Sequence, residues 1–342
     1  MKILILSHKF YPNIGGIEVN SEVLSQVFVD FGHEVHLMTW TKEEGDKKFP
    51  YKLIRNPPIY IQFREHVWCD IVFENNPCLR LSWPVLFTFK PTVIALNTWV
   101  SKIDGSIGIQ EKLKNKWLNR AQAVIAVSKA VGKHSWPKSI IIGNPYRNTV
   151  FKVLPEILKN KTFVFLGRLV SDKGGDLAIL AFKEFVSKFK SKNFSLTIIG
   201  DGPELLKLKE IVRQVEIEEL VTFTGALVGD KLVECLNSHK YLLVPSQWEE
   251  PFGNVVLEGM ACGCVPIVSD GGGLPDAIGK AGLIFERGNL KSLIDKITFL
   301  LENPQVEKKL RQKAKLHLEN HTPQLIGTKY LEVLEKALHP YK

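Results

Sequence analysis

Short apolar runs alternate along this chain with segments in which apolar residues recur every three or four positions. The run from Lys2 to Ser7 is typical of a strand buried on both faces. In residues 17–31, valine or phenylalanine recurs at intervals of four, which predicts a helix that stops at Gly32. The same alternation continues to about residue 145. It predicts a parallel sheet covered by helices.

The pattern restarts at residue 161. In the first half, the other predicted elements are strands at 33–39, 70–73, 92–96, 123–127 and 139–142, strand-like pieces within 51–65, and a helix at 107–119. In the second half they are strands at 161–166, 195–199, 221–223, 241–244, 265–268 and 282–285, with helices at 176–189, 204–216, 231–238, 255–262 and beyond 289. Two such series predict two doubly wound, Rossmann-like α/β domains with a hinge within 143–160.

Composition is that of an ordinary globular protein. Hydrophobic residues make up 45% of the 342 residues and charged residues 24%. No apolar run is long enough to span a bilayer, and the apolar start is too short for a signal peptide. We therefore expect a cytoplasmic protein without a cleaved leader. The five cysteines follow no metal-binding spacing and are expected to be free thiols.

The chain is basic, with 45 Lys and Arg against 36 Asp and Glu, and the first 150 residues carry most of the excess. This favours an anionic partner such as membrane lipid or a phosphorylated substrate, or simply a solvated basic surface. No motif for nucleic acid binding is present. The basic stretch Glu111–Arg120 carries apolar Leu113, Trp117 and Leu118. It is either a peripheral contact with an anionic membrane or an ordinary amphipathic helix.

Two sites suit an anion. Gly15 and Gly16 follow the first strand and precede a helix start, where a backbone can approach an anion closely. Arg168 and Lys173 follow the strand that opens the second series, and together they would clamp a phosphate. The alternatives are a plain tight turn for the glycines and two exposed loop cations for the basic pair.

The segment from Glu250 to Glu258 carries more information. Pro251 and Gly253 force a tight turn between a strand and a helix, and one acid lies on each side of the helix start. Free N–H groups and the helix dipole suit a diphosphate there, while carboxylates suit hydroxyls on either side of it. The layout therefore predicts a site for a nucleotide-diphospho-sugar, with a helix-capping acid as the alternative.

These residues resemble the E-x7-E motif of retaining glycosyltransferases of the "group 1" family, which has the GT-B fold. The resemblance covers nearly the whole chain and is strongest over residues 160–290. The segments that carry it are Gly15-Gly16, Arg168 with Lys173, Gly200-Asp201-Gly202-Pro203-Glu204, Phe223-Thr224-Gly225, Glu250 to Glu258, and Gly271-Gly272-Gly273-Leu274-Pro275. It implies an acceptor-binding domain at 1–145, a nucleotide-sugar-binding domain at 146–325 facing it across a cleft, and a helix at 326–342 returning to the first domain.

The resemblance also implies roles for single residues. Arg168 and Lys173 would bind the donor diphosphate and stabilise it as it leaves, while Glu250 would hold hydroxyls of the donor sugar. Glu258 would hydrogen-bond the ribose. The other residues implied to bind the donor are Gly15 and Gly16 at the distal phosphate, Phe252, Gly253, Asn254 and Val255 through the helix start, and Gly225 and Leu227 at the base.

One position departs from the family pattern. Many members have a histidine after the fourth strand of the first domain, whereas this chain has Asn97, which cannot act as a base near pH 7. Transfer can still proceed in the front-face mechanism proposed for the family, in which the leaving phosphate takes the acceptor proton. We expect Asn97 and Trp99 on the acceptor side. His66 is a further candidate there, and for both Trp99 and His66 packing is the alternative.

The resemblance implies a retaining hexosyltransferase that uses a nucleotide-sugar, UDP-glucose for example, and a glycan or lipid-linked acceptor. No D-x-D motif occurs, so we expect no required metal and no cofactor, with Arg168, Lys173 and the helix start stabilising the diphosphate instead. Two alternatives stay open. One is a nucleotide-sugar epimerase of the same fold, and the other is a catalytically idle nucleotide-sugar-binding protein.

Overall fold

The computed structural model describes residues 1–13, 15–100, 108–189 and 194–339. The chain forms two compact units. The first contains Met1–Pro145 and the residues from His321 onward, and the second contains Tyr146–Asn320. The chain thus returns to the first unit at His321, whereas the sequence placed this return at residue 326. No helix among the described residues combines the length and the apolar character needed to cross a bilayer.

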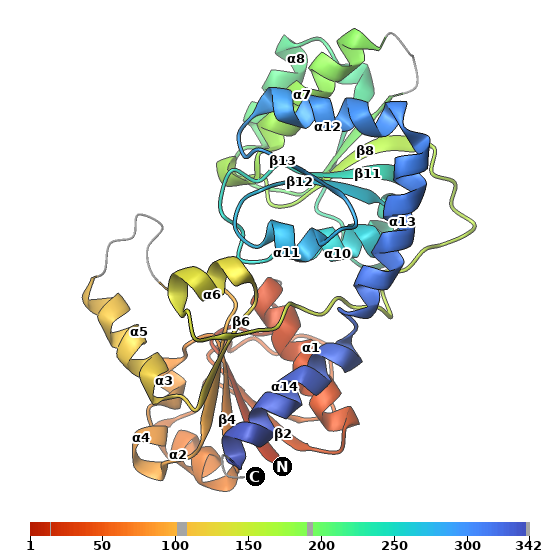
Figure 1. The fold of residues 1–342 in the computed structure, drawn as a ribbon. Coiled ribbons are helices and arrows are strands. Elements are labelled where there is room, and N and C mark those ends of the chain that lie inside the picture. Colours follow the sequence, from red (N-terminus) through yellow and green to blue (C-terminus); the bar gives the residue numbers. More distant parts are fainter. Residues whose placement is uncertain (14, 101–107, 190–193, 340–342) are drawn as a thin grey trace. The chain divides into compact units, whose positions relative to one another are not determined.

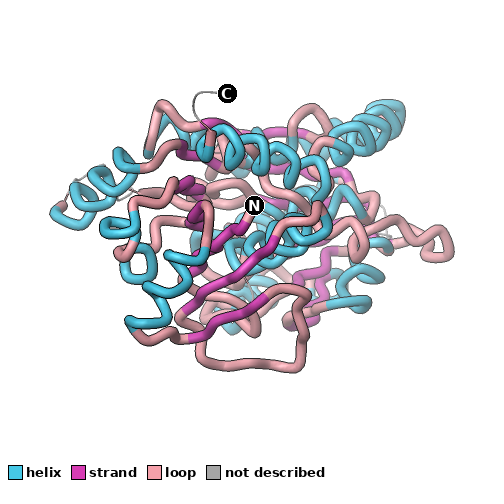
Figure 2. The backbone as a smooth tube through the Cα atoms, turned by 90° about the horizontal axis from the view of Figure 1, so that it is seen from below, coloured by secondary structure: helices cyan, strands magenta, loops and turns pink. Residues whose placement is uncertain are grey.

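The first unit is built on a parallel sheet with β1 near its centre, as Figure 2 also shows. Within the described residues the strand order is β3-β2-β1-β4-β5-β6-β7, so the order reverses between β1 and β4. The strands are β1 (Lys2–Ser7), β2 (Glu34–Thr39), β3 (Lys52–Arg55), β4 (Ile71–Asn75), β5 (Thr92–Leu96), β6 (Ala123–Ala126) and β7 (Ile140–Ile141). The central strands are buried on both faces, as their continuous apolar runs predict.

Helices cover both faces of this sheet (Figure 1). On one face α1 (Gly16–Asp30) packs against α14 (Pro323–Leu338), and Gly327 allows the close approach, since an added Cβ would lie 2.2 Å from Val27 Cγ1. Tyr330 of α14 is fully buried against Phe73. The other helices are α2 (Ile59–Trp68), α3 (Leu79–Ser82), α4 (Val85–Thr88), α5 (Ile109–Arg120) and α6 (Lys129–Ser135). The last part of the chain therefore completes the core of the first part.

The second unit has a parallel sheet in the order β10-β9-β8-β11-β12-β13 across the described residues. Its strands are β8 (Lys161–Leu166), β9 (Leu196–Ile199), β10 (Val221–Gly225), β11 (His239–Val244), β12 (Val265–Ser269) and β13 (Leu283–Phe285). Figure 1 shows α7, α8 and α12 on one face of this sheet and α10 and α11 on the other. The helices are α7 (Gly175–Lys188), α8 (Leu205–Gln214), α9 (Gly229–Asn237), α10 (Asn254–Ala261), α11 (Leu274–Ile278), α12 (Leu290–Glu302) and α13 (Pro304–Glu319), with single 3-10 turns η1 (Ser171–Lys173) and η2 (Glu218–Leu220).

A partly buried lysine ties the connecting segment to the second unit. Lys159 Nζ donates to the carbonyl oxygens of Asn237, His239 and Cys262 at 2.9, 3.0 and 2.8 Å. Burial lowers the pKa of Lys159. The Asn237 side chain adds a bond to the amide N–H of Leu154 at 2.8 Å. The later part of the predicted hinge, 143–160, is therefore held against the second unit.

One local prediction was wrong. Residues 51–65 do not consist only of strand-like pieces, because β3 is followed by helix α2. Pro58 caps this helix, since a proline ring suits the φ angle of a helix start and costs no hydrogen bond there. Cys262 and Cys264 both lie in the turn between α10 and β12. All five cysteines are free thiols, as expected.

Candidate functional site

In the second unit, the predicted site residues follow the carboxyl ends of parallel strands, which share one edge of the sheet. Arg168 and Lys173 follow β8, whereas Glu250 follows β11. The strand order reverses between these two strands, and ligands of doubly wound sheets bind outside the carboxyl ends at such a reversal. The topology therefore places the basic pair and the acid on either side of the expected binding position.

Lys173 and Glu250 form an ion pair through Lys173 Nζ and Glu250 Oε1. Both side chains are largely buried, with exposed fractions of 18% and 11%. The Ser246 hydroxyl lies 3.0 Å from Glu250 Oε1 and 3.0 Å from the Asp172 carbonyl oxygen, so it can donate to either. The Trp248 ring lies 5.6 Å from Lys173 Nζ, within cation–π distance. The site is thus preformed around a lysine and a carboxylate.

Two glycines let the loops of this site meet. Gly174 has φ +71°, and an added Cβ would lie 2.0 Å from the carbonyl oxygen of Pro245. Gly272 has φ +60°, and its Cβ would lie 2.2 Å from the carbonyl oxygen of Glu250. That carbonyl accepts a bond from the Gly273 N–H at 2.6 Å. Side chains at either glycine would push apart the backbones that carry Lys173 and Glu250.

Arg168 differs from Lys173 in its surroundings. It is exposed and takes part in no ion pair among the described residues. Its loop is nevertheless fixed, because the Leu169 N–H donates to Asp201 O at 2.9 Å and the Leu169 carbonyl accepts from Glu204 N–H at 2.9 Å. Gly200 and Gly202 face this backbone too closely for any Cβ. Arg168 is therefore an available cation on a fixed loop.

Helix α10 begins four residues after Glu250. Gly253 precedes the helix with φ +103° and provides no side-chain cap. Phe252 is buried and anchors the turn, while Asn254 and Val255 are partly exposed and begin the helix. The first N–H groups and the positive end of the helix dipole attract negative charge. The position predicted for a phosphate at this helix start stays a prediction.

Glu258 lies further along α10 and is partly buried. Burial raises the pKa of Glu258 to about 7, although the charge of Arg147 acts in the opposite direction. The carboxyl group therefore changes charge near neutral pH. A ligand that donates hydrogen bonds to it would favour the charged form.

The remaining predicted residues of this unit lie at the end of the edge strand. Gly225 ends β10 with φ +73°, and its carbonyl accepts from the Gly200 N–H at 2.9 Å. Leu227 is partly exposed just beyond it. Two contributors were missed from the sequence, Ser246 beside Glu250 and Arg147 beside Glu258. The sequence offered one weak signal for each residue. Ser246 is a polar residue directly after Pro245, and Arg147 is a polar residue near Pro145.

In the first unit, Gly15 and Gly16 begin α1 at the carboxyl end of β1, as predicted. The Glu18 carboxylate folds back over this helix start, since a Cβ on Gly15 would lie 2.4 Å from Glu18 Oε2. A carboxylate at the start of a helix is stabilised by the dipole and by the free N–H groups. The turn therefore suits negative charge.

Asn97 belongs to a buried polar network. It is 9% exposed, and its Oδ1 accepts from Asn20 Nδ2 at 3.1 Å while its Nδ2 donates to Asn75 Oδ1 at 2.6 Å. Both ends of the amide are thus bonded within the first unit. Trp99 is partly exposed, with its ring edge-on to His134. His66 is fully buried, and its Nδ1 lies 2.8 Å from the Gln62 carbonyl oxygen, so the packing interpretation holds for it.

Comparison with known proteins identifies the family. The family model for glycosyl transferases group 1 matches residues 147–317, which is half of the chain and includes the ion pair and α10. The chain belongs to this family. Among curated relatives, this group 1 glycosyltransferase is similar to 2-deoxystreptamine N-acetyl-D-glucosaminyltransferase of Niallia circulans, with 28% identity over 66% of the chain and 57% of that protein. It is also 23% identical to N-acetyl-α-D-glucosaminyl L-malate synthase of Bacillus anthracis, over 89% of each chain.

Solved structures establish the fold. The chain matches HepE of Anabaena in complex with UDP and glucose with a TM-score of 0.81 and 18% identity, over 98% of this chain and 100% of that chain. It matches WaaG, a glycosyltransferase involved in lipopolysaccharide biosynthesis, with a TM-score of 0.70 and 15% identity, over 97% and 99% of the two chains. The group 1 glycosyltransferase described here therefore has the GT-B fold. The resemblance seen in the sequence is confirmed for both family and fold.

Proposed function

We propose that this protein is a retaining glycosyltransferase that transfers a hexose from a UDP-sugar to a hydroxyl of a glycan or lipid-linked acceptor. The observation that carries the proposal is the Lys173–Glu250 ion pair beside the start of α10, at the reversal of strand order. A cation, a carboxylate and the positive end of a helix together suit a sugar joined to a diphosphate. Family membership supports the transferase, and the UDP complex of HepE supports the nucleotide.

The donor would bind the second unit through four kinds of contact. Arg168 and Lys173 would pair with the diphosphate, together with the N–H groups of α10. Glu250 would accept hydrogen bonds from sugar hydroxyls and Glu258 from the ribose. Gly225 and Leu227 would line the position of the base. Arg168 is free to meet the diphosphate, whereas Lys173 would exchange part of its contact with Glu250 for it.

In the reaction, the bond between the anomeric carbon and the diphosphate oxygen breaks while the acceptor oxygen bonds to the same carbon. The acceptor proton passes to the leaving diphosphate oxygen. Negative charge grows on the diphosphate as the bond breaks, and Arg168 and Lys173 would stabilise it most at that moment. We propose that these cations and the helix start fill the role that a metal ion has in other glycosyltransferases. Among the described residues, no cluster of His, Cys, Asp and Glu is arranged to hold a metal ion.

The acceptor would bind the first unit. Gly15 and Gly16 would approach the distal phosphate of the donor, and Trp99 would offer an apolar surface to a sugar ring. The network around Asn97 would position this part of the first unit, because its amide is already bonded at both ends. Acceptor recognition by Asn97 itself would require one of those bonds to open.

The donor and the reaction can be tested together. The names of both curated relatives include an N-acetylglucosaminyl group, so UDP-N-acetylglucosamine is a second donor to test beside UDP-glucose. Incubation of each with a lipid-diphosphate sugar, followed by mass spectrometry, should show one added sugar and released UDP. An epimer or free UDP without an acceptor product would indicate an epimerase. Binding without any product would indicate an idle binding protein, and either result would contradict the proposal.

We also propose a peripheral membrane contact through α5. Ile109 and Leu113 are 80% and 53% exposed on this helix, beside exposed Lys112 and Lys116. Leu118, by contrast, is buried in the first unit, so only part of the predicted amphipathic face is available. Exposed apolar side chains beside lysines suit an anionic bilayer.

The membrane contact predicts sedimentation with vesicles that contain phosphatidylglycerol, but not with phosphatidylcholine alone. Leu113→Glu should reduce the bound fraction, because it places a charge in the interface. Leu316→Glu, at a position 64% exposed in the second unit, is the matched control. Equal sedimentation of the wild type with both vesicle types would overturn this part of the proposal.

A further inference from the structure

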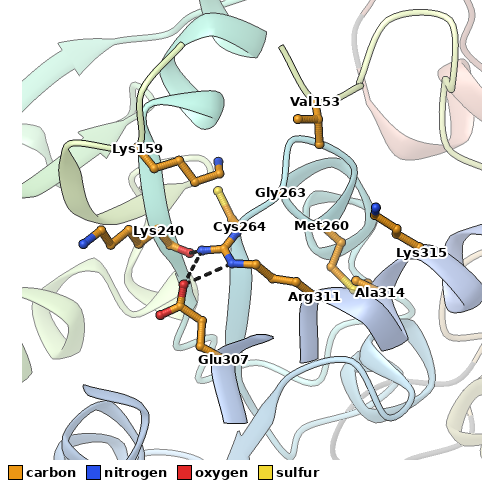
Figure 3. Close-up of a pocket in the computed structure, with 10 residues that line it drawn as sticks. All are labelled: Val153, Lys159, Lys240, Met260, Gly263, Cys264, Glu307, Arg311, Ala314 and Lys315. Carbon is orange, nitrogen blue, oxygen red and sulfur yellow. Dashed lines mark hydrogen bonds and ion pairs between the residues drawn. The ribbon is translucent and has the colours of Figure 1, made fainter. Parts of the chain in front are cut away.

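A cavity of about 360 Å³ lies in the second unit, among α10, α13, β11 and the connecting segment (Figure 3). Its volume falls within the range of small-molecule sites. The residues that line it are Val153, Lys159, Lys240, Met260, Gly263, Cys264, Glu307, Arg311, Ala314 and Lys315. None of the residues expected to bind the donor is among them. The cavity therefore belongs to no function assigned so far.

The walls of this cavity are largely apolar. Met260, Cys264 and Ala314 are buried, and Val153 covers one side from the connecting segment. Gly263 has φ +78°, and an added Cβ would lie 3.1 Å from Lys159 Cε. The Lys159 ammonium group bonds to three carbonyl oxygens and so is already satisfied. These walls suit the apolar body of a ligand better than a sugar or a nucleotide.

The charged groups of the cavity favour an anion. Arg311 donates through Nε and Nη2 to Glu307 Oε1, at 3.0 and 2.8 Å, and through Nη2 to the carbonyl oxygen of Lys240. Glu307 is also held by the Tyr241 hydroxyl at 2.6 Å. Arg311 is thereby fixed in place, while its Nη1 has no hydrogen-bond partner among the described residues. Figure 3 shows the bonds between Arg311 and Glu307, and the Lys240 side chain directed away from them.

Lys315 supplies a second cation. It is exposed on α13, lines the cavity and takes part in no ion pair in the part of the chain that the structure describes. Four cationic residues line the cavity against Glu307 as its single carboxylate. We propose that this cavity binds a small amphipathic anion, with its apolar body against Met260, Ala314 and Val153. Its carboxylate or phosphate group contacts Arg311 Nη1 and Lys315 Nζ.

Octanoate is a suitable probe, with octanol and octylammonium as the neutral and cationic comparisons. Calorimetry on the full chain should show one saturable site for octanoate and weaker binding of the other two. Lys315→Glu should weaken octanoate binding by about tenfold, since it reverses one of the two charges that meet the head group. Lys313→Glu, at an exposed position on the same helix that does not line the cavity, should leave binding unchanged.

A second variant tests the cavity without changing its charge. Val153 is 52% exposed, so Val153→Trp should fold normally and fill the space, which would remove octanoate binding. Val228→Trp, at a position 65% exposed, is its control. The proposal fails if octanoate does not bind at millimolar concentration, if octylammonium binds as well as octanoate, or if both cavity variants bind like the wild type. None of these measurements depends on glycosyl transfer, so the result is independent of the proposed function.

Discussion

Lys173→Ala should lower kcat/KM for the donor by about 100- to 1,000-fold, the usual loss when one preorganised group that stabilises transition-state charge is removed. The lysine is held beside Glu250 and Trp248 before any ligand arrives, so it only has to exchange part of its contact with Glu250 to meet the diphosphate. Steady-state kinetics with the best donor would measure the loss. Thermal unfolding would confirm that the variant is folded.

Glu250→Gln provides the informative comparison. It removes the charge that pairs with Lys173, so UDP should bind at least as tightly as in the wild type. Transfer should still fall, because Glu250 is expected to hold the sugar. Lys231→Ala, at an exposed position in the same unit, is the matched control and should retain full activity. Activity of Lys173→Ala within threefold of the wild type would remove this lysine from the proposed mechanism.

Glu258→Gln should weaken donor binding by about tenfold or more at pH 8, the loss expected for hydrogen bonds to a charged group. Because burial raises the pKa of Glu258 to about 7, wild-type binding of UDP-glucose should strengthen as pH rises through 7 and the carboxylate forms. The diphosphate of this donor has no proton that titrates near pH 7. Calorimetry between pH 5.5 and 8.5 should show a slope in the wild type and none in Glu258→Gln.

The free protein should show the opposite dependence in its stability. The pKa of Glu258 is raised from its ordinary value of 4.5 to about 7, so the native state binds the proton more tightly than the unfolded chain. The stability that the protonated carboxyl group contributes is complete below pH 4.5, and it is lost as pH rises through 7. The midpoint temperature of unfolding of Glu258→Gln should therefore rise relative to that of the wild type between pH 5 and pH 8. A difference in unfolding temperature between the two proteins that stays constant with pH would contradict the raised pKa of Glu258.

The sequence predicted most strands, because a strand buried on both faces is a continuous apolar run. Lys2–Ser7 and Lys161–Leu166 are predicted to the residue. Helices that depend on proline or on tertiary packing were harder. The helix after Pro58 was missed because Pro57 and Pro58 interrupt the apolar pattern. Two prolines interrupt such a pattern in the same way whether a strand or a helix follows them. The five-residue helix that begins at Leu274 was missed because three glycines precede it.

The candidate site was predictable only in part. Each site residue was found from its own local motif, but the contact between Lys173 and Glu250 spans 77 positions and depends on the strand order. The hydrogen-bond partners of Asn97 could not be predicted from the residues next to it in the sequence. Its amide bonds to Asn20 and Asn75, which lie on other elements, and no spacing in the sequence indicates that network. Glu258, in contrast, has apolar neighbours in the sequence, which agrees with its partial burial.

The packing of α14 on α1 has a consequence for how the protein is made. β1 is synthesised before the second unit, yet α14, which covers one face of its sheet, is synthesised after it. The middle of the chain, Tyr146–Asn320, is complete before Tyr330 can reach Phe73. The nascent first unit therefore keeps an uncovered apolar face until α14 has been synthesised.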